Sequence, residues 1–258
     1  MALVPFLETI GRLIIRYLES VGKVLLLLGA SLAQLRRRPD MGQVLRQMAH
    51  LGADSLPIVL LTMLFTGMVM TMQISHEFIK YGAQSSVGGV VAIAMGRELA
   101  PVLAGIVAAG RVGAAITAEI GSMKVTEQID ALRVMATDPV AYLVVPRLIA
   151  CVFMLPVLVV FADVIGTVGG YAVATAYAGI GSYTFTHSIK VFAVVNDVTG
   201  GLIKSMVFGA IIAIIGCYKG LTTAEGAEGV GRATTGSVVT SMILIFVSNY
   251  FLSYILYR

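Results

Sequence analysis

Several ionisable side chains lie inside long apolar stretches of the sequence, among them Arg97 and Glu98 in one stretch and Lys204 in another. An ionised group is expensive to place in hydrocarbon, so each is a candidate functional residue. Neighbouring residues on a helix point about 100° apart, so Arg97 and Glu98 are expected to seek separate partners. We predict that Arg97 and Lys204 favour a lipid phosphate while Glu98 orders them. The alternative is a purely structural network of ion pairs.

Residues 63–73, with the sequence MLFTGMVMTMQ, are rich in methionine. Thioether side chains are flexible and adapt to irregular apolar partners. We therefore predict that Met68, Met70 and Met72, with Phe65, line a cavity for acyl chains. Phe65, Met68 and Met72 are expected to bind lipid together with Arg97, Glu98 and Lys204. Ordinary core packing, or contact with bilayer lipid, is the alternative interpretation.

The remaining residue types give little sign of catalysis. The three histidines fall at or beyond the ends of apolar stretches, and the two cysteines, Cys151 and Cys217, fall within them. Histidines at an interface and small buried thiols do not make a zinc site, so no metal is predicted. The glycine-rich segment 219–236 suggests a flexible connector, and the sequence contains no GxxxxGK[ST] phosphate loop. We therefore predict no catalytic residue, no cofactor and no ATP hydrolysis in this chain.

The composition indicates that these residues belong to a membrane protein. Of the 258 residues, 58% are hydrophobic and 12% are charged, whereas a soluble domain carries about 25% charged residues. We predict an all-α polytopic membrane protein with five transmembrane helices, at 55–76, 88–111, 146–178, 199–218 and 236–256. The third span contains Pro156 and is predicted as one tilted or kinked helix, because two spans and a turn need about 40 residues.

The segment 5–35, ahead of the first span, has charged residues at three- and four-residue steps and apolar residues on the other face. This pattern predicts an amphipathic helix with Glu8–Arg12 and Glu19–Lys23 pairs. We expect it to lie along the membrane interface. The alternative is a packed helix of a soluble cap.

The distribution of positive charge predicts the orientation of the five spans. With the N-terminus in the cytoplasm, the inner segments hold twelve lysines and arginines and the outer segments hold three, Lys80, Lys190 and Arg258. Cytoplasmic loops carry such an excess. The inner residues are Arg12, Arg16, Lys23, Arg36, Arg37, Arg38, Arg46, Lys124, Arg133, Arg147, Lys219 and Arg232. The C-terminus is therefore expected outside.

A polar segment, 112–147, separates the second and third spans and is predicted to be cytoplasmic. Within it, residues 126–136 form a short amphipathic helix that Thr126 caps and the Asp138–Pro139 pair ends. A short helix held by two long spans can dock into the groove of a soluble partner and transmit motion to the membrane. The alternative is a solvated helix that packs on the membrane surface.

Several motifs in this region resemble those of the MlaE/YrbE permease family: RELAP at 97–101, AGRVG at 109–113, TAEIGSM at 117–123 and TEQIDAL at 126–132. The similarity continues in AEGAEGVGRATTGSVV at 224–239 and fits the length of a single permease domain, 1–258. The chain differs from the pattern at Ala100 and Ala136, where glycine is common, and at Ala114, where serine is common.

Members of this family are membrane subunits of ABC transporters that move phospholipids or other lipids together with MCE-domain proteins. The resemblance implies that 126–136 is the coupling helix for a cytoplasmic ATPase, which would bind and use ATP and Mg²⁺. It also implies a homodimer with lipid held between the subunits. The residues expected to act in ATPase coupling are Glu119, Glu127, Asp130, Arg133 and Met135.

Three classes of function and two locations follow. The first class is an ABC permease for phospholipid or a related lipid, and the alternative is an ion-coupled secondary transporter of a hydrophobic substrate. The third class is a non-transporting membrane scaffold, against which the polar segment 112–147 and the intramembrane charges argue. Secondary transporters often show inverted repeats, and none is found here. The expected location is the bacterial inner membrane, but a protein of the plastid inner envelope would show the same pattern.

Overall fold

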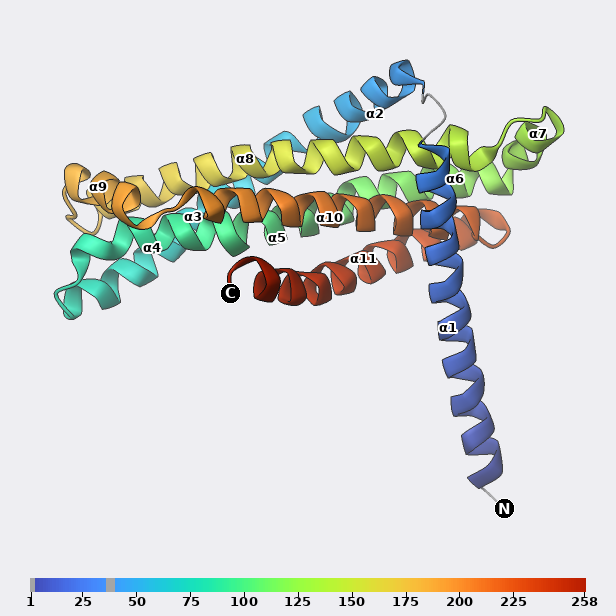
Figure 1. The fold of residues 1–258 in the computed structure, drawn as a ribbon, viewed down its shortest axis with the longest axis horizontal. Coiled ribbons are helices and arrows are strands. Elements are labelled where there is room, and N and C mark those ends of the chain that lie inside the picture. Colours follow the sequence, from blue (N-terminus) through green and yellow to red (C-terminus); the bar gives the residue numbers. More distant parts are fainter. Residues whose placement is uncertain (1–2, 36–39) are drawn as a thin grey trace.

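The computed structural model describes residues 3–35 and 40–258, and this part of the chain is helical without β-strands (Figure 1). Within it, five helical stretches are long and apolar enough to cross a membrane. They are Met41–Lys80, Gln84–Val125, Val140–Ala176, Val195–Leu221 and Gly226–Leu256. The predicted all-α polytopic fold is confirmed. The observed stretches begin before the predicted spans because polar turns continue the helices outside the apolar segments. The third stretch ends at Ala176, two residues before its predicted end.

The third stretch forms the centre of the bundle. Its helix α8 (Val145–Ala176) packs most extensively against α3 (Leu56–Lys80) and α10 (Val195–Leu221). Glycines make this packing possible, because a Cβ at Gly67 would collide with the carbonyl oxygen of Gly166, and one at Gly209 with that of Cys151. Small residues let helix backbones approach closely in this way. Pro156 lies inside α8, which confirms one helix for this segment.

Two π-helices interrupt the α-helix of the second stretch. In order, this stretch contains α4 (Val87–Ala94), a π-helix at Met95–Leu99, α5 (Ala100–Ala108), a π-helix at Ala109–Gly113 and α6 (Ala114–Val125). A third π-helix, Val140–Val144, leads into α8. A π turn inserts an extra residue into the helical turn and so redirects the side chains that follow it.

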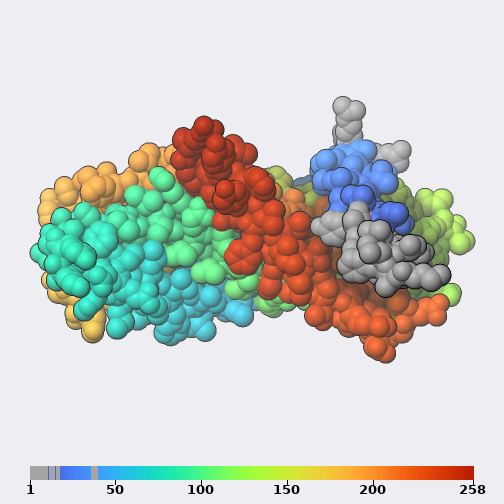
Figure 2. Space-filling model, turned by 90° about the horizontal axis from the view of Figure 1, so that it is seen from below, coloured from blue at the N-terminus to red at the C-terminus, as the bar shows by residue number. Residues whose placement is uncertain are grey.

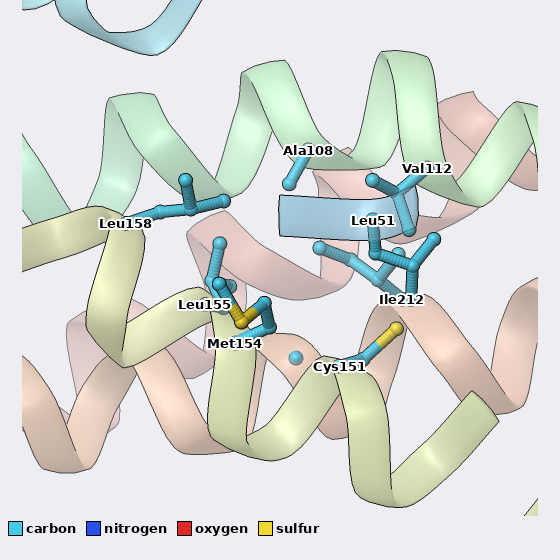
Figure 3. Close-up of a pocket in the computed structure, with 9 residues that line it drawn as sticks. Leu51, Ala108, Val112, Cys151, Met154, Leu155, Leu158 and Ile212 are labelled. Carbon is cyan, nitrogen blue, oxygen red and sulfur yellow. The ribbon is translucent and has the colours of Figure 1, made fainter. Parts of the chain in front are cut away.

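The helices converge around a small apolar cavity of about 20 Å³. Figure 3 shows Leu51 from α2 (Met41–Ala53) facing Val112 from the second stretch, Cys151 from α8 and Ile212 from α10. These four residues therefore mark one common level across the bundle. Both cysteines are buried in the surrounding core, as predicted.

Helix α1 (Leu3–Gln34) runs across the bundle axis near the end that carries α7 (Gln128–Val134), as Figure 1 shows. The predicted Glu19–Lys23 pair is present, with 2.7 Å between oxygen and nitrogen. The side chains of Glu8 and Arg12, and residues Arg36, Arg37 and Arg38, lie outside the described residues. An interfacial position for α1 stays a prediction.

The coupling segment is shorter than predicted, and both of its predicted end signals are wrong. The helix covers Gln128–Val134 rather than 126–136, because Glu127 and Ala136 on either side adopt left-handed backbone conformations, with φ of 59° and 56°. Thr126 does not cap it but donates its hydroxyl to the carbonyl of Ser122. Asp138 instead accepts a bond from the N–H of Val140 and so begins the next helix.

Two further differences concern the other loops. A short helix, α9 (Ser182–Phe192), was not predicted; it packs against α4 at the end of the bundle opposite α7. Helix α11 begins at Gly226 rather than at residue 236, so most of the predicted flexible connector is helical. Figure 2 shows α11, in red, lying over the surface of the bundle.

Candidate functional site

The three predicted intramembrane charges lie together on facing helices. The Nζ atom of Lys204 is 2.8 Å from a carboxylate oxygen of Glu98 and also donates to the hydroxyl of Ser253 at 2.7 Å. Its third hydrogen bond, 2.8 Å long, goes to the backbone carbonyl of Arg97. An ammonium group has three hydrogens to donate, so these contacts satisfy Lys204. Its side chain is 0% exposed.

The sequence explains why a backbone carbonyl is available at this point. In a regular helix the carbonyl of Arg97 would accept the N–H of residue 101, but residue 101 is a proline and has none. The preceding π-helix pairs the N–H of Ala100 with Met95. The RELAP motif therefore leaves an acceptor inside the bundle, and Lys204 from α10 satisfies it.

Arg97 and Glu98 form ion pairs with different residues, as predicted. The Nε of Arg97 lies 2.6 Å from a carboxylate oxygen of Asp197, and its guanidinium lies over the ring of Tyr257, 4.7 Å from the ring centre. Asp197 is buried, and its second oxygen accepts the N–H of Val194 at the start of α10. The side chain of Arg97 is still 37% exposed, so it is the more accessible of the two cations.

Sequence reasoning missed the partners that complete this network. Asp197 lies seven residues before Lys204, two turns along the same face of α10. Asn249, Ser253 and Tyr257 follow one another at four-residue steps on or just after α11, and Asn249 donates to the second oxygen of Glu98 at 2.9 Å. Polar residues at four-residue steps in an apolar span were the signal that could have identified them.

An open groove of about 520 Å³ runs along the same half of the bundle. Of the four predicted cavity residues, Phe65 and Met70 line it, whereas Met68 and Met72 do not. Met68 packs toward Gly169 of α8, and Met72 lines a separate depression beside Tyr177. The helical turn places other side chains in the groove: Thr66, Val69 and Gln73 of α3, with Leu99 of the second stretch.

At the opposite end of the bundle, α6 and α8 support the segment that joins them, which contains α7 and is called here the α6–α7 corner. Arg147 is only 4% exposed and donates to Glu119 at 2.8 Å and to the carbonyl of Leu143 at 2.7 Å. Glu119, predicted in coupling, therefore belongs to the base that supports α7, not to α7 itself.

On α7, the predicted residue Asp130 makes two ion pairs. It accepts from Lys124 at 2.9 Å and from Arg133 at 2.9 Å. The hydrogen bond from Lys124 is the largest cause that lowers the pKa of Asp130 below its ordinary value, and desolvation opposes it. The two pairs stabilise the α6–α7 corner.

The surface that α7 presents is apolar. Ile129 is buried toward α6, whereas Val134 and Met135 are 88% and 66% exposed. Met135 was predicted as a coupling residue, and Val134 was missed although the adjacent Val–Met pair could have indicated it. Glu127, at the start of α7, is exposed. An exposed apolar pair at the tip of a rigid corner is suited to insertion into a partner's groove.

Comparison with known proteins places this arrangement in a family. The family model described as "Permease MlaE" matches residues 44–255. A probable ABC transporter permease protein of Synechocystis is 50% identical over 224 residues, 87% of this chain and 85% of the relative. One from Rickettsia typhi is 43% identical over 250 residues, 96% of each chain.

A plant relative is also similar. The chloroplastic protein trigalactosyldiacylglycerol 1 of Arabidopsis thaliana is 43% identical over 209 residues, 81% of this chain and 60% of that protein. The predicted family is thus confirmed over most of the sequence: this chain belongs to the MlaE permease family of ABC transporter membrane subunits.

Proposed function

We propose that this permease moves phospholipid or a related lipid, as a homodimer that works with a cytoplasmic ABC ATPase and an MCE-domain protein. An ATPase partner follows from membership of an ABC permease family. The name of the chloroplast relative contains a diacylglycerol glycolipid, which is in keeping with lipid as the cargo.

The observation that supports lipid is the open groove beside a charged network. Its lining is mainly apolar and includes Leu99, which follows Glu98 directly in the chain. A lipid has the same two parts, apolar chains and a polar headgroup. Arg97 is partly exposed, whereas Lys204 is buried with its three donors used. We therefore assign headgroup contact to Arg97 and give Lys204 and Glu98 the role of positioning the π-helix.

The opposite end supports the coupling part of the proposal. ATP and Mg²⁺ would be bound by the partner ATPase, and this chain would receive the movement at Val134 and Met135. Asp130 ties α7 to α6, and the Glu119–Arg147 pair ties α6 to α8. Movement of α7 would therefore displace both long helices together. Helix α3 packs against α8, so the groove that α3 forms with Leu99 would change with them.

The orientation that fits this scheme puts the α7 end in the cytoplasm and the C-terminus on the outer side. A bacterial inner membrane, or the plastid inner envelope in the case of a plastid protein, is the proposed location.

Filling the groove tests the proposal. In the complex reconstituted in liposomes, Val69→Trp places an indole in the groove, and Val160→Trp adds one at a similarly exposed position of α8. We expect Val69→Trp to lower both co-purified phospholipid and ATP-dependent transfer of labelled lipid about tenfold. Val160→Trp should leave both unchanged. Equal effects of the two variants would contradict the assignment of the groove.

The same liposomes discriminate against the alternative class. A secondary transporter would move its substrate without the ATPase and stop when an ionophore removes the ion gradient. We expect transfer that needs ATP and persists with the ionophore.

A further inference from the structure

A second polar pocket lies near the α7 end, away from the groove and the Arg97 network. It has a volume of about 280 Å³ and lies between α2, α6 and the start of the third stretch. Its lining is polar on one side and apolar on the other. The residues are Gln43, Arg46 and Gln47 of α2, Glu119 and Met123 of α6, and Tyr142, Leu143, Pro146 and Arg147.

The pocket has a net positive charge and donors that are not all used. Arg46 and Arg147 contribute two positive charges and Glu119 one negative charge. Arg147 spends two nitrogens on Glu119 and Leu143, but its buried Nε has no hydrogen-bond partner among the described residues. This Nε is closed off from the pocket, so the exposed guanidinium of Arg46 is the donor that a ligand can reach. The net positive charge of the lining favours an anion as that ligand.

The α2 side of the pocket is suited to a phosphate. Gln43, Arg46 and Gln47 are three and four residues apart, so they share one face of the helix. A guanidinium and two amide groups on one face can donate several hydrogen bonds to phosphate oxygens. The exposed Arg46 has no salt-bridge partner in the part of the chain that is described.

The position of the pocket indicates that the phosphate belongs to a lipid. Helix α3 has 25 residues, about 37 Å, and so spans the hydrocarbon layer of about 30 Å by itself. Helix α2 then lies at the edge of that layer, where headgroups are found. On the same helix, Leu45 lies next to Arg46 in the chain and is 60% exposed. The lipid can contact Leu45 with its apolar part while the headgroup enters the pocket.

We propose that the phosphate of a lipid in the leaflet at the α7 end binds between α2, α6 and α8, in contact with Arg46, Gln43 and Gln47. This lipid is a resident ligand and not the transported one, because it lies at the opposite end of the bundle from Arg97. It links α2 to the Glu119–Arg147 pair and so stiffens the base of α7.

Binding to the full-length purified permease tests the proposal without an ATPase or a transport assay, so its failure is separate from failure of the proposed function. The protein is delipidated in detergent and titrated with dioleoylphosphatidylglycerol in mixed micelles, and the midpoint of thermal unfolding is followed. Arg46→Gln removes the exposed cation of the pocket. Arg232→Gln removes an equally exposed cation of α11 outside it.

We expect a saturable rise in the midpoint for the unaltered protein and for Arg232→Gln, and about tenfold weaker binding for Arg46→Gln. Dioleoylglycerol, which has the same chains without phosphate, should give no rise. Equal binding by Arg46→Gln and the unaltered protein would overturn the proposal. So would an equal rise with dioleoylglycerol, which would show acyl contacts only, or with inorganic phosphate alone, which would show a soluble anion.

Discussion

The Glu98–Lys204 pair should respond unequally to loss of its two members. In Glu98→Leu the ammonium of Lys204 stays 0% exposed and keeps only two neutral acceptors, the carbonyl of Arg97 and the hydroxyl of Ser253. Removing one partner from a buried ion pair costs about 3–5 kcal/mol. In Lys204→Met the carboxylate of Glu98 is 41% exposed and keeps Asn249 and Ser253 as donors. That variant should lose about 1.5–3 kcal/mol, the value for a hydrogen bond to a charged group.

The double variant sharpens the test. Glu98→Leu with Lys204→Met removes both charges and should be at least about 2 kcal/mol more stable than Glu98→Leu alone, because no unpaired ion remains. Reversible unfolding of the purified protein in mixed micelles, followed by circular dichroism, measures the three free energies. Glu228→Gln, which breaks an exposed pair with Arg232, is the control and should change little. If Lys204→Met costs as much as Glu98→Leu, the difference in burial does not control the energetics.

Four smaller predictions follow from single contacts. Gly200→Ala places a methyl group 2.5 Å from the hydroxyl of Tyr257 and should lower the unfolding free energy by about 1–3 kcal/mol, an effect that Tyr257→Ala in the same chain should remove. Ala136→Gly relieves a left-handed alanine with φ of 56° and should raise the unfolding free energy by about 1 kcal/mol; no gain would mean that this conformation is unstrained. Serine at both Val134 and Met135 should weaken co-purification of the ATPase without changing the unfolding midpoint, and intact assembly would exclude this apolar tip as the docking surface. The Lys124–Asp130 bond should hold at neutral pH and be lost as pH falls through the lowered pKa of Asp130, below its ordinary value of 3.8, because a depressed carboxyl pKa gives stability only above it; protection from hydrogen exchange at 126–136, taken relative to the intrinsic amide rate at each pH, should fall in acid in the unaltered protein, whereas Asp130→Asn should show the lower protection already at neutral pH.

Much of the fold was predictable because hydropathy and charge determine where a helix can cross a bilayer. The five spans, the single long helix containing Pro156 and the shared location of Arg97, Glu98 and Lys204 follow from these terms. The ends of α7 did not follow, because they depend on left-handed backbone at Glu127 and Ala136. A propensity for capping at Thr126 says nothing about such conformations.

The hydrogen-bond partners of the charged residues also could not be predicted from the sequence pattern. Which face of a helix a side chain occupies depends on the helical phase, and the π-helix at Met95–Leu99 shifts that phase by one residue. The same uncertainty of phase explains why Val69 lines the groove without having been predicted there, whereas Met68 and Met72 point elsewhere.

The carbonyl that Pro101 leaves unpaired joins two positions 103 residues apart in the chain into one unit. Neither is useful without the other: an N–H at position 101 would compete for the oxygen that Lys204 occupies, and a shorter side chain at 204 would leave that oxygen bare. Natural variation in this protein should therefore change the two sites jointly. A sequence survey that found the lysine retained wherever the proline is replaced would show that they are inherited separately.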